Sequence, residues 1–474
     1  MSLLWTANAM VEAMGGRPIG ALPAGITGIS IDSRTLKPGE AFFAIKGDAL
    51  DGHDFATSAI KAGAVLLVVA ESKLAGLGRI TTPMIVVDDV LAGLVKLSVA
   101  ARARAKGKII AVTGSAGKTT TKEALRHVLS AVGSVHASER SFNNHWGVPL
   151  MLARLPEETD FAVFEIGMNH ADEIRPLVKL VRPHIAIITL IAAAHLGHFR
   201  KIEEIARAKA EIFEGIEPGG YALLNRDDAQ FKLLEKLAKA AGVAHIVSFG
   251  EHERAQVRLL ACDLSGDHSD IAIGIQGGKV TARVGAPGRH MVQNALAVLG
   301  AAKLAGADLA KVAEALGDLQ AEAGRGRRHR LGGGITLIDE SYNANPASMK
   351  AAIDLLDRTE PAAGGRRIAV LGDMLELGEH AERLHAGIAD LIVPTKTDLV
   401  YLGGPEMTAL AAKLPPERLG AYAANVDELK PIVLAALRPG DVVVVKSSKG
   451  IGFSKLVDTL IKNFPVEGES QRRA

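Results

Sequence analysis

The stretch that decides the fold is Lys108-Ile109-Ile110-Ala111-Val112-Thr113-Gly114-Ser115-Ala116-Gly117-Lys118-Thr119-Thr120. An apolar run typical of a buried strand leads into a Gly-Lys-Thr turn, and residues 120–132 have the spacing of a helix. This order predicts a phosphate-binding loop, because backbone N–H groups, a helix N-terminus and the Lys118 ammonium converge on one point. We therefore expect a nucleoside triphosphate to bind here. The expected loop residues are Gly114, Ser115, Ala116, Gly117, Lys118, Thr119 and Thr120, with the Thr119 hydroxyl on the metal side.

This loop is shorter than the general phosphate-loop motif. The general motif has its first glycine five residues before the Gly of Gly-Lys-Thr, where this chain has Val112. The alternative is a plain glycine turn between a strand and a helix, with Lys118 in solvent.

Composition limits the class of protein. The chain has 474 residues, which predicts several domains, and 55 Lys and Arg against 53 Asp and Glu, which argues against nucleic acid as a partner. A single cysteine, Cys262, excludes an internal disulfide framework. We find no run of about 18 apolar residues and no signal-like N-terminus, so we expect no membrane span and a cytoplasmic location. A monomer is expected.

The pattern of strands and helices predicts an α/β protein of three domains. Residues 1–106 form a small α/β domain with strands at 28–34, 41–45, 65–69 and 84–87 and helices at 54–62 and 90–105. Residues 107–323 form a central domain with a parallel sheet, which strands in 257–284 extend in antiparallel fashion. Residues 324–474 form a Rossmann-like domain that begins with an exposed hinge over 324–334 and has strands at 335–339, 367–371, 399–402 and 441–446.

Two residues of the central domain are candidate metal ligands. Glu165 ends the apolar strand 161–166, at the edge of the sheet where the ligands of open α/β folds gather. A carboxylate there suits Mg²⁺, and a carboxylate facing water is the alternative. His195 follows the apolar run 185–191, but a lone histidine in a loop is more often a surface or packing residue.

Lys209 lies on the apolar stripe of a predicted helix over 202–216. A buried lysine must reach solvent along its stem, pair with an anion or lose its charge. A neutral amine can add to carbon dioxide, and the carbamate would supply oxygen ligands to a second metal ion. Both this reading and simple extension to solvent stay open from the residues alone.

Three polar motifs follow strands of the last domain. Within Asp339-Glu340-Ser341-Tyr342-Asn343-Ala344-Asn345-Pro346, Asn345 is suited to cap a helix that begins at Pro346. Capping does not explain Asp339 and Asn343, which suit contacts to a ribose or to a second substrate. Residues 372–378 and 446–450 repeat the arrangement of a strand followed by a polar loop.

Together these motifs resemble those of the Mur ligases, the ATP-dependent amide-forming enzymes of peptidoglycan synthesis. The short loop 113–120 is the form of that family. Further matching motifs are 32–34, 51–54, 141–149, 165–169, 341–346 and 371–378. The last two resemble the branch that adds D-Ala-D-Ala to UDP-N-acetylmuramoyl-tripeptide. The Asp-Asn-Pro-Arg motif of the Mur ligase that adds the third peptide residue does not occur in this sequence.

The resemblance implies a reaction and roles for single residues. ATP would phosphorylate the tripeptide carboxylate, and the dipeptide amine would attack the acyl phosphate to give the pentapeptide. Lys118, His195 and Lys209 would be catalytic. Thr119, Glu165, His195 and a carbamylated Lys209 would hold magnesium, two ions in all. Asn294, Arg325 and Asp339 would contact ATP, Ser33 and Arg34 the uridine diphosphate, Asn143 and Asn144 the muramoyl part, and Asn343 and Asn345 the dipeptide.

Two motifs depart from the family, and two other functions stay open. Residues 190–195 lack an asparagine usual before His195, and Lys449 replaces a usual arginine, which removes a bidentate fork. A folylpolyglutamate synthase is not expected to carry the Asp-Ser-Arg motif of the first domain. A nucleotide-gated binding protein without chemistry would keep Lys118 but would not need Lys209. Phosphate release that requires both substrates distinguishes the three.

Overall fold

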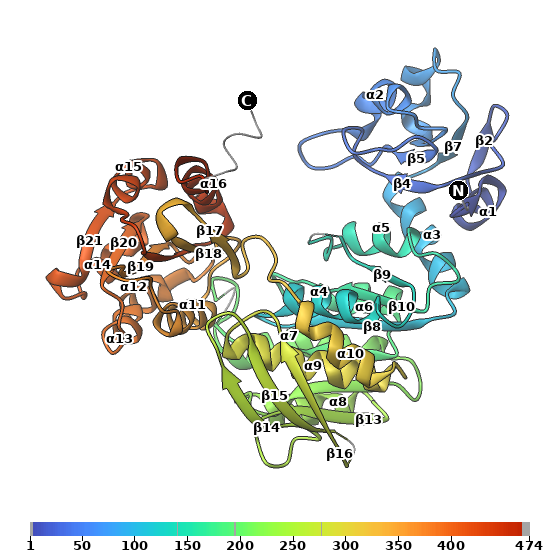
Figure 1. The fold of residues 1–474 in the computed structure, drawn as a ribbon. Coiled ribbons are helices and arrows are strands. Elements are labelled where there is room, and N and C mark those ends of the chain that lie inside the picture. The colour runs from blue at the N-terminus through green and yellow to red at the C-terminus, as the bar shows by residue number, and fades with distance from the viewer. Residues whose placement is uncertain (1–2, 140, 194–195, 276, 467–474) are drawn as a thin grey trace.

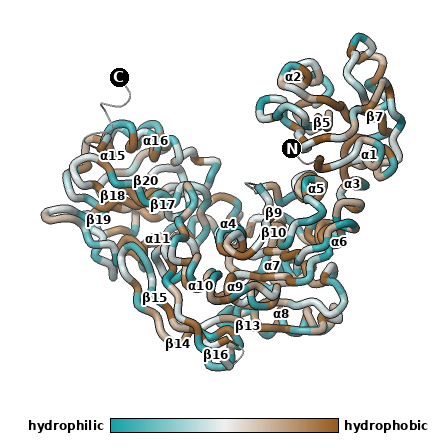
Figure 2. Tube along the Cα trace, turned by 45° about the vertical axis from the view of Figure 1, so that its right-hand side comes forward, coloured by the Kyte–Doolittle hydropathy of each residue, from teal (hydrophilic) through white to brown (hydrophobic). Residues whose placement is uncertain are grey.

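The computed structural model describes residues 3–139, 141–193, 196–275 and 277–466. The chain folds into three α/β domains, as predicted, and the N-terminal domain (blue) and C-terminal domain (orange to red) stand on opposite sides of the central domain (Figure 1). Hydrophobic segments run through the interior strands of all three (Figure 2). Within the described ranges, no helix is both long and apolar enough to cross a membrane.

The N-terminal domain is built on a sheet with the strand order β2-β7-β6-β5-β4. Its strands are β2 (Arg17–Ile19), β4 (Gly28–Ser30), β5 (Glu40–Phe43), β6 (Leu66–Ala70) and β7 (Met84–Val87), and β1 (Trp5–Thr6) pairs separately with β3 (Gly25–Ile26). Its helices are α1 (Ala7–Met14), α2 (Ala56–Lys61) and α3 (Val90–Arg104). The strands and helices predicted for this domain are therefore confirmed, apart from their ends and the short strands β1 to β3.

The central domain has one sheet with the order β16-β15-β14-β13-β12-β11-β8-β10-β9. The parallel part comprises β8 (Lys108–Thr113), β9 (Val135–Ala137), β10 (Phe161–Glu165), β11 (Ile185–Ile188), β12 (Tyr221–Asn225), β13 (His245–Gly250) and β14 (Val257–Leu264). The strands β15 (Ser269–Ile275) and β16 (Gly278–Val284) continue it in antiparallel fashion, which confirms the extension predicted over 257–284 except at β14, since β14 pairs in parallel fashion with β13.

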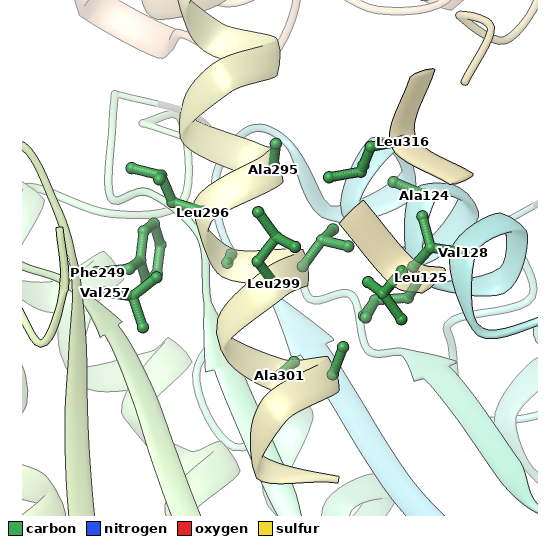
Figure 3. Packing of buried hydrophobic residues seen from close by; sticks show 14 of the residues in the cluster. Ala124, Leu125, Val128, Phe249, Val257, Ala295, Leu296, Leu299, Ala301 and Leu316 are labelled. Carbon is green, nitrogen blue, oxygen red and sulfur yellow. The ribbon is translucent and has the colours of Figure 1, made fainter. Parts of the chain in front are cut away.

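Helices cover both faces of the central sheet. They are α4 (Lys118–Leu129), α5 (Gly147–Ala153), α6 (Ile174–Val181), α7 (Ile202–Ala210), α8 (Phe231–Ala240), α9 (Arg289–Leu304) and α10 (Leu309–Ala315). In β8, Ile110 and Val112 pack into the cluster formed with α4 and α9, while Ile109 and Ala111 pack into the cluster on the other face. Figure 3 shows α9 between side chains of α4 and of the sheet, with Leu299 at the centre. This double burial holds β8, and hence the loop after it, rigidly in the middle of the sheet.

The C-terminal domain has a sheet with the order β17-β18-β22-β19-β20-β21. Its strands are β17 (Arg327–Arg330), β18 (Thr336–Glu340), β19 (Arg367–Gly372), β20 (Leu399–Gly403), β21 (Leu419–Ala423) and β22 (Val442–Lys446). Its helices are α11 (Pro346–Arg358), α12 (Ala381–Ala386), α13 (Ile388–Ile392), α14 (Thr408–Ala411), α15 (Val426–Ala436) and α16 (Phe453–Asn463). The boundaries at 106/107 and 323/324 stay predictions.

The exposed hinge predicted over 324–334 is wrong in part. Residues 327–330 form β17, which pairs in antiparallel fashion with β18, and both Gly324 and Gly326 are buried. The Gly326 N–H donates to the Asp339 carbonyl oxygen at 2.8 Å. A basic edge strand shows no apolar alternation because its pairing uses backbone groups, which the sequence pattern does not report.

Candidate functional site

A cavity of about 540 Å³ lies between the central and C-terminal domains. One wall comes from loops at the carboxyl ends of β8, β10 and β11 and from α9, and the other from loops that follow β18, β19 and β22. The lining includes Ser115, Ala116, Gly117, Lys118, Thr119, Thr120, Ser141, Asn143, Glu165, Asn294, Arg325, Glu340, Tyr342, Asn343, Asn345, Glu376, Lys446 and Lys449. Most residues predicted for nucleotide, metal and dipeptide binding therefore share one cavity.

Two glycines let the phosphate loop fold as it does. Gly117 precedes α4 with a φ of 82°, a conformation that side chains with a Cβ rarely adopt. A Cβ at Gly117 would lie 2.6 Å from Asn294 Oδ1, and one at Gly114 would lie 1.9 Å from Thr189 Oγ1. The backbone of the loop is thus pressed against β11 and α9, and Asn294 lies beside it.

Lys118 is the first residue of α4, and its Nζ donates to the Gly114 carbonyl oxygen at 2.8 Å. Burial lowers the pKa of the Lys118 ammonium, Glu165 raises it, and the charge of Arg325 lowers it. The effect of Arg325 means that a cation of the C-terminal domain lies close to the phosphate loop. The N-terminus of α4, with the Lys118 ammonium and the Arg325 guanidinium nearby, suits a polyphosphate.

Glu165 is held at the end of β10 by two polar side chains. Its Oε2 accepts a hydrogen bond from Thr119 Oγ1 at 2.8 Å, and its Oε1 accepts one from Asn143 Nδ2 at 2.8 Å. The side chain is 1% exposed, so the alternative of a carboxylate facing water does not hold. Thr119 and Glu165 together offer a hydroxyl and a carboxylate oxygen beside the phosphate loop.

Lys209 is buried in α7, with 1% of its surface exposed, so it does not extend to solvent. Burial lowers the pKa of its ammonium well below the usual value, and the nearby charge of Lys118 lowers it further. The predicted ligand His195 lies outside the described residues. Among the described residues, no cluster of three or more His, Cys, Asp or Glu side chains could hold a metal.

Asn345 links the C-terminal domain to the phosphate loop. Its side chain caps α11 by accepting from the Ser348 backbone N–H at 2.9 Å, and Pro346 follows at the start of the helix, as predicted. Its Nδ2 also donates to the Ser115 carbonyl oxygen at 3.4 Å. The capping residue therefore contacts the opposite wall of the cavity.

Models of the Mur ligase family match most of the chain. The Mur ligase family catalytic domain matches residues 25–131, the Mur ligase middle domain residues 112–302, and the Mur ligase glutamate ligase domain residues 324–449. The UDP-N-acetylmuramoyl-tripeptide–D-alanyl-D-alanine ligase of Rickettsia prowazekii is 33% identical over 91% of this chain and 94% of that protein. The chain belongs to the Mur ligase family.

Solved structures of Mur ligases share this three-domain fold over nearly the whole chain. MurF from Acinetobacter baumannii matches at 30% identity with a TM-score of 0.83, covering 97% of this chain and 99% of that one. MurF from Thermotoga maritima, solved in complex with ADP, matches in fold at 24% identity and a TM-score of 0.75, covering 94% and 98%.

Some residues that the sequence predicts for this Mur ligase do not line the cavity. Ser33 and Arg34 follow β4 in the N-terminal domain, where the Arg34 side chain is 86% exposed and pairs with Asp32 at 2.7 Å. The Asn144 side chain accepts from the Gly147 N–H at 2.9 Å, at the start of α5. Asp339 is buried, and its carboxylate accepts from the Gly324 N–H at 2.7 Å and from Ser341 Oγ at 2.6 Å.

The sequence predicted no role for several residues that line the cavity. Lys446 Nζ lies 3.2 Å from Glu340 Oε2 and donates to the Asn343 carbonyl oxygen at 3.0 Å, so a buried ion pair supports the 340–345 loop. Tyr342 stacks under Arg325 and shares a hydrogen bond with Ser141. Tyr342 is one of 4 tyrosines in the chain and stands within the Asp339–Pro346 motif, which was the available signal.

Proposed function

We propose that this Mur ligase joins D-Ala-D-Ala to UDP-N-acetylmuramoyl-tripeptide in an ATP-dependent step of peptidoglycan synthesis. The observation that carries the proposal is the single cavity lined by the phosphate loop, Glu165 and the loop that contains Asn343 and Asn345. Support for the substrates comes from the Rickettsia relative, which is named for this reaction and matches along almost the whole chain.

The γ-phosphoryl group of ATP passes to the terminal carboxylate of the tripeptide, giving an acyl phosphate and ADP. The neutral amine of the dipeptide then attacks the acyl carbon, and phosphate leaves as the amide forms and the amine loses a proton. This transfer depends mainly on positioning and on stabilising negative charge. Lys118 and the N–H groups at the start of α4 hold the β- and γ-phosphates, which explains why Lys118 lies in the loop wall.

Thr119 and Glu165 fit a magnesium ion. Hydroxyl, carboxylate and phosphate oxygens with water are the ligands that Mg²⁺ takes in triphosphate sites, and Thr119 Oγ1 lies 2.8 Å from Glu165 Oε2. When bound, Mg²⁺ neutralises charge on the transferred phosphoryl group. Asn143 fixes the orientation of the Glu165 carboxylate through its hydrogen bond to Oε1.

Lys209 is proposed to carry a carbamate. A buried amine with a lowered pKa keeps a neutral fraction that can add to carbon dioxide with loss of a proton. The carbamate and His195 would then hold a second Mg²⁺. Lys209→Ala should lose ligation and regain part of it with a short carboxylic acid such as acetate, whereas the exposed control Lys201→Ala should ligate normally. Normal activity of Lys209→Ala would contradict this role.

The remaining contacts follow the family resemblance. Asn294 contacts the purine, and Ser33 and Arg34 contact the uridine diphosphate from the N-terminal domain. Asn143 and Asn144 lie toward the muramoyl part, and Asn343 and Asn345 toward the dipeptide. Arg325 and Asp339 serve the nucleotide, with Asp339 holding the turn at Gly324 that presents Arg325. The protein is further proposed to be a monomer that acts in the cytoplasm. Light scattering on the purified protein measures its mass in solution and so tests whether it is a monomer.

The test is phosphate release by the purified protein with ATP and Mg²⁺. Release should require both UDP-N-acetylmuramoyl-tripeptide and D-Ala-D-Ala and should match the pentapeptide found by mass spectrometry. Omission of either substrate is the control. Release with glutamate and a folate, or no release at all, would overturn the proposal.

A further inference from the structure

Tyr342 gathers two cations on the C-terminal wall of the cavity. It lies between β18 and α11, and the Arg325 guanidinium lies 4.1 Å from the centre of its ring. The Lys449 ammonium, which comes from the loop after β22, lies 5.4 Å from the same ring. A cation within about 6 Å of an aromatic face is attracted by the ring. Both charges are therefore attracted to the ring of Tyr342.

The hydroxyl of the same tyrosine reaches the central domain. It shares a hydrogen bond with Ser141 Oγ, which lies on the opposite wall. The Ser141 carbonyl oxygen accepts from the Asn143 N–H at 2.8 Å, and Asn143 Nδ2 donates to Glu165. A continuous set of contacts thus runs from the candidate metal ligand Glu165 to the cations beside Tyr342.

Two further contacts between the central and C-terminal domains use backbone atoms. Asn345 Nδ2 donates to the Ser115 carbonyl oxygen at 3.4 Å, and the Gly197 N–H donates to the Glu376 carbonyl oxygen at 2.8 Å. The Ser141–Tyr342 bond instead joins two side chains, so a substitution can remove it without changing the backbone.

We propose that Tyr342 is a positioning residue that couples the loop around Ser141 to the placement of Arg325 and Lys449. The proposal rests on the proposed ligase function. When Ser141 holds the hydroxyl, the two cations face the phosphates and the dipeptide, and the walls exclude water from the acyl phosphate. Without the bond, the cations and the C-terminal wall are held less firmly, and water can attack the acyl carbon, releasing phosphate and returning the tripeptide carboxylate.

The test compares Tyr342→Phe, Ser141→Ala and the double variant with wild type, with Tyr422→Phe in β21 as a control. Each single variant should lower kcat/KM for D-Ala-D-Ala by about tenfold, the effect expected from loss of one hydrogen bond. The double variant should lose no more than either single variant. Both single variants should release more than one phosphate per amide formed, whereas wild type and Tyr422→Phe should release one. The melting temperature should not change.

The outcomes separate the two proposals. Wild-type protein that releases no phosphate with these substrates overturns the ligase function and this inference with it. Active wild type with additive single variants, or with an unchanged ratio of phosphate to amide, overturns the coupling through Tyr342 alone. A lowered melting temperature in the single variants would also contradict it, since it indicates a purely structural role.

Discussion

Replacing Gly117 by alanine should weaken ATP binding through one identified contact. The backbone at Gly117 has a φ of 82°, and the new Cβ would lie 2.6 Å from Asn294 Oδ1. Forcing a residue with a Cβ into the left-handed region costs roughly 1–2 kcal/mol. The Asn294 side chain must also move, because 2.6 Å is too short for a carbon–oxygen contact.

Gly306→Ala is a matched control for the backbone cost. Gly306 has a φ of 81°, and a Cβ there would meet nothing within 4 Å. Urea denaturation should therefore show a loss of stability of roughly 1–2 kcal/mol in both variants. Only Gly117→Ala should raise the KM for ATP, by about tenfold if Asn294 loses one hydrogen bond to the purine.

A double variant isolates Asn294. If displacement of Asn294 causes the defect, Gly117→Ala combined with Asn294→Ala should have the same KM for ATP as Asn294→Ala alone. Steady-state assays at saturating concentrations of the other substrates measure this. Additive losses, or a KM for ATP that rises equally in Gly306→Ala, would refute the reasoning.

Three further predictions follow from the same structure. Asn143→Ala removes the hydrogen bond that orients Glu165, so the Mg²⁺ concentration for half-maximal activity should rise by about 10–100-fold; an unchanged requirement counts against Glu165 as a ligand. Lys446→Met leaves Glu340 unpaired at a nearly buried position and should cost about 3–5 kcal/mol in urea denaturation, and adding Glu340→Gln should recover part of that loss. In protein freed of carbon dioxide Lys209 carries no carbamate, and its pKa is lowered in the folded protein, so between that pKa and about 10.4 the unfolded chain binds more protons. The free energy of unfolding should therefore rise with pH in this window relative to Lys209→Met, and parallel pH profiles would contradict the shift.

The features that the sequence predicts correctly depend on local patterns. The buried run in β8, the turn at Gly117 and the cap at Asn345 are each encoded within a few residues, and all three form as predicted. The burial of Lys209 also follows from its place on the apolar stripe of α7. Such features need no knowledge of how the domains meet.

The features that the sequence misses depend on pairing between distant segments. β17 forms because β18 offers a backbone edge, and Tyr342 acquires its neighbours because residues 141, 325 and 449 meet in space. The hydrogen bonds of Asp339 were missed for the same reason, since its carboxylate accepts from the N–H groups of Gly324 and Ser341. A pattern within one segment carries no information about these partners.

Strand β17 also decides where the chain can bend. The N–H groups of Gly324 and Gly326 are bonded to Asp339, so the residues around Arg325 move as part of the C-terminal sheet. If the C-terminal domain rotates, the bend in the chain therefore falls before Gly324. Arg325 then moves together with the C-terminal sheet. Withdrawal of the C-terminal domain removes a positive charge from the phosphate loop in the same movement. The nucleotide site therefore has the positive charge of Arg325 only while the C-terminal domain lies against the phosphate loop. The charge around ATP thus depends on the position of the whole domain.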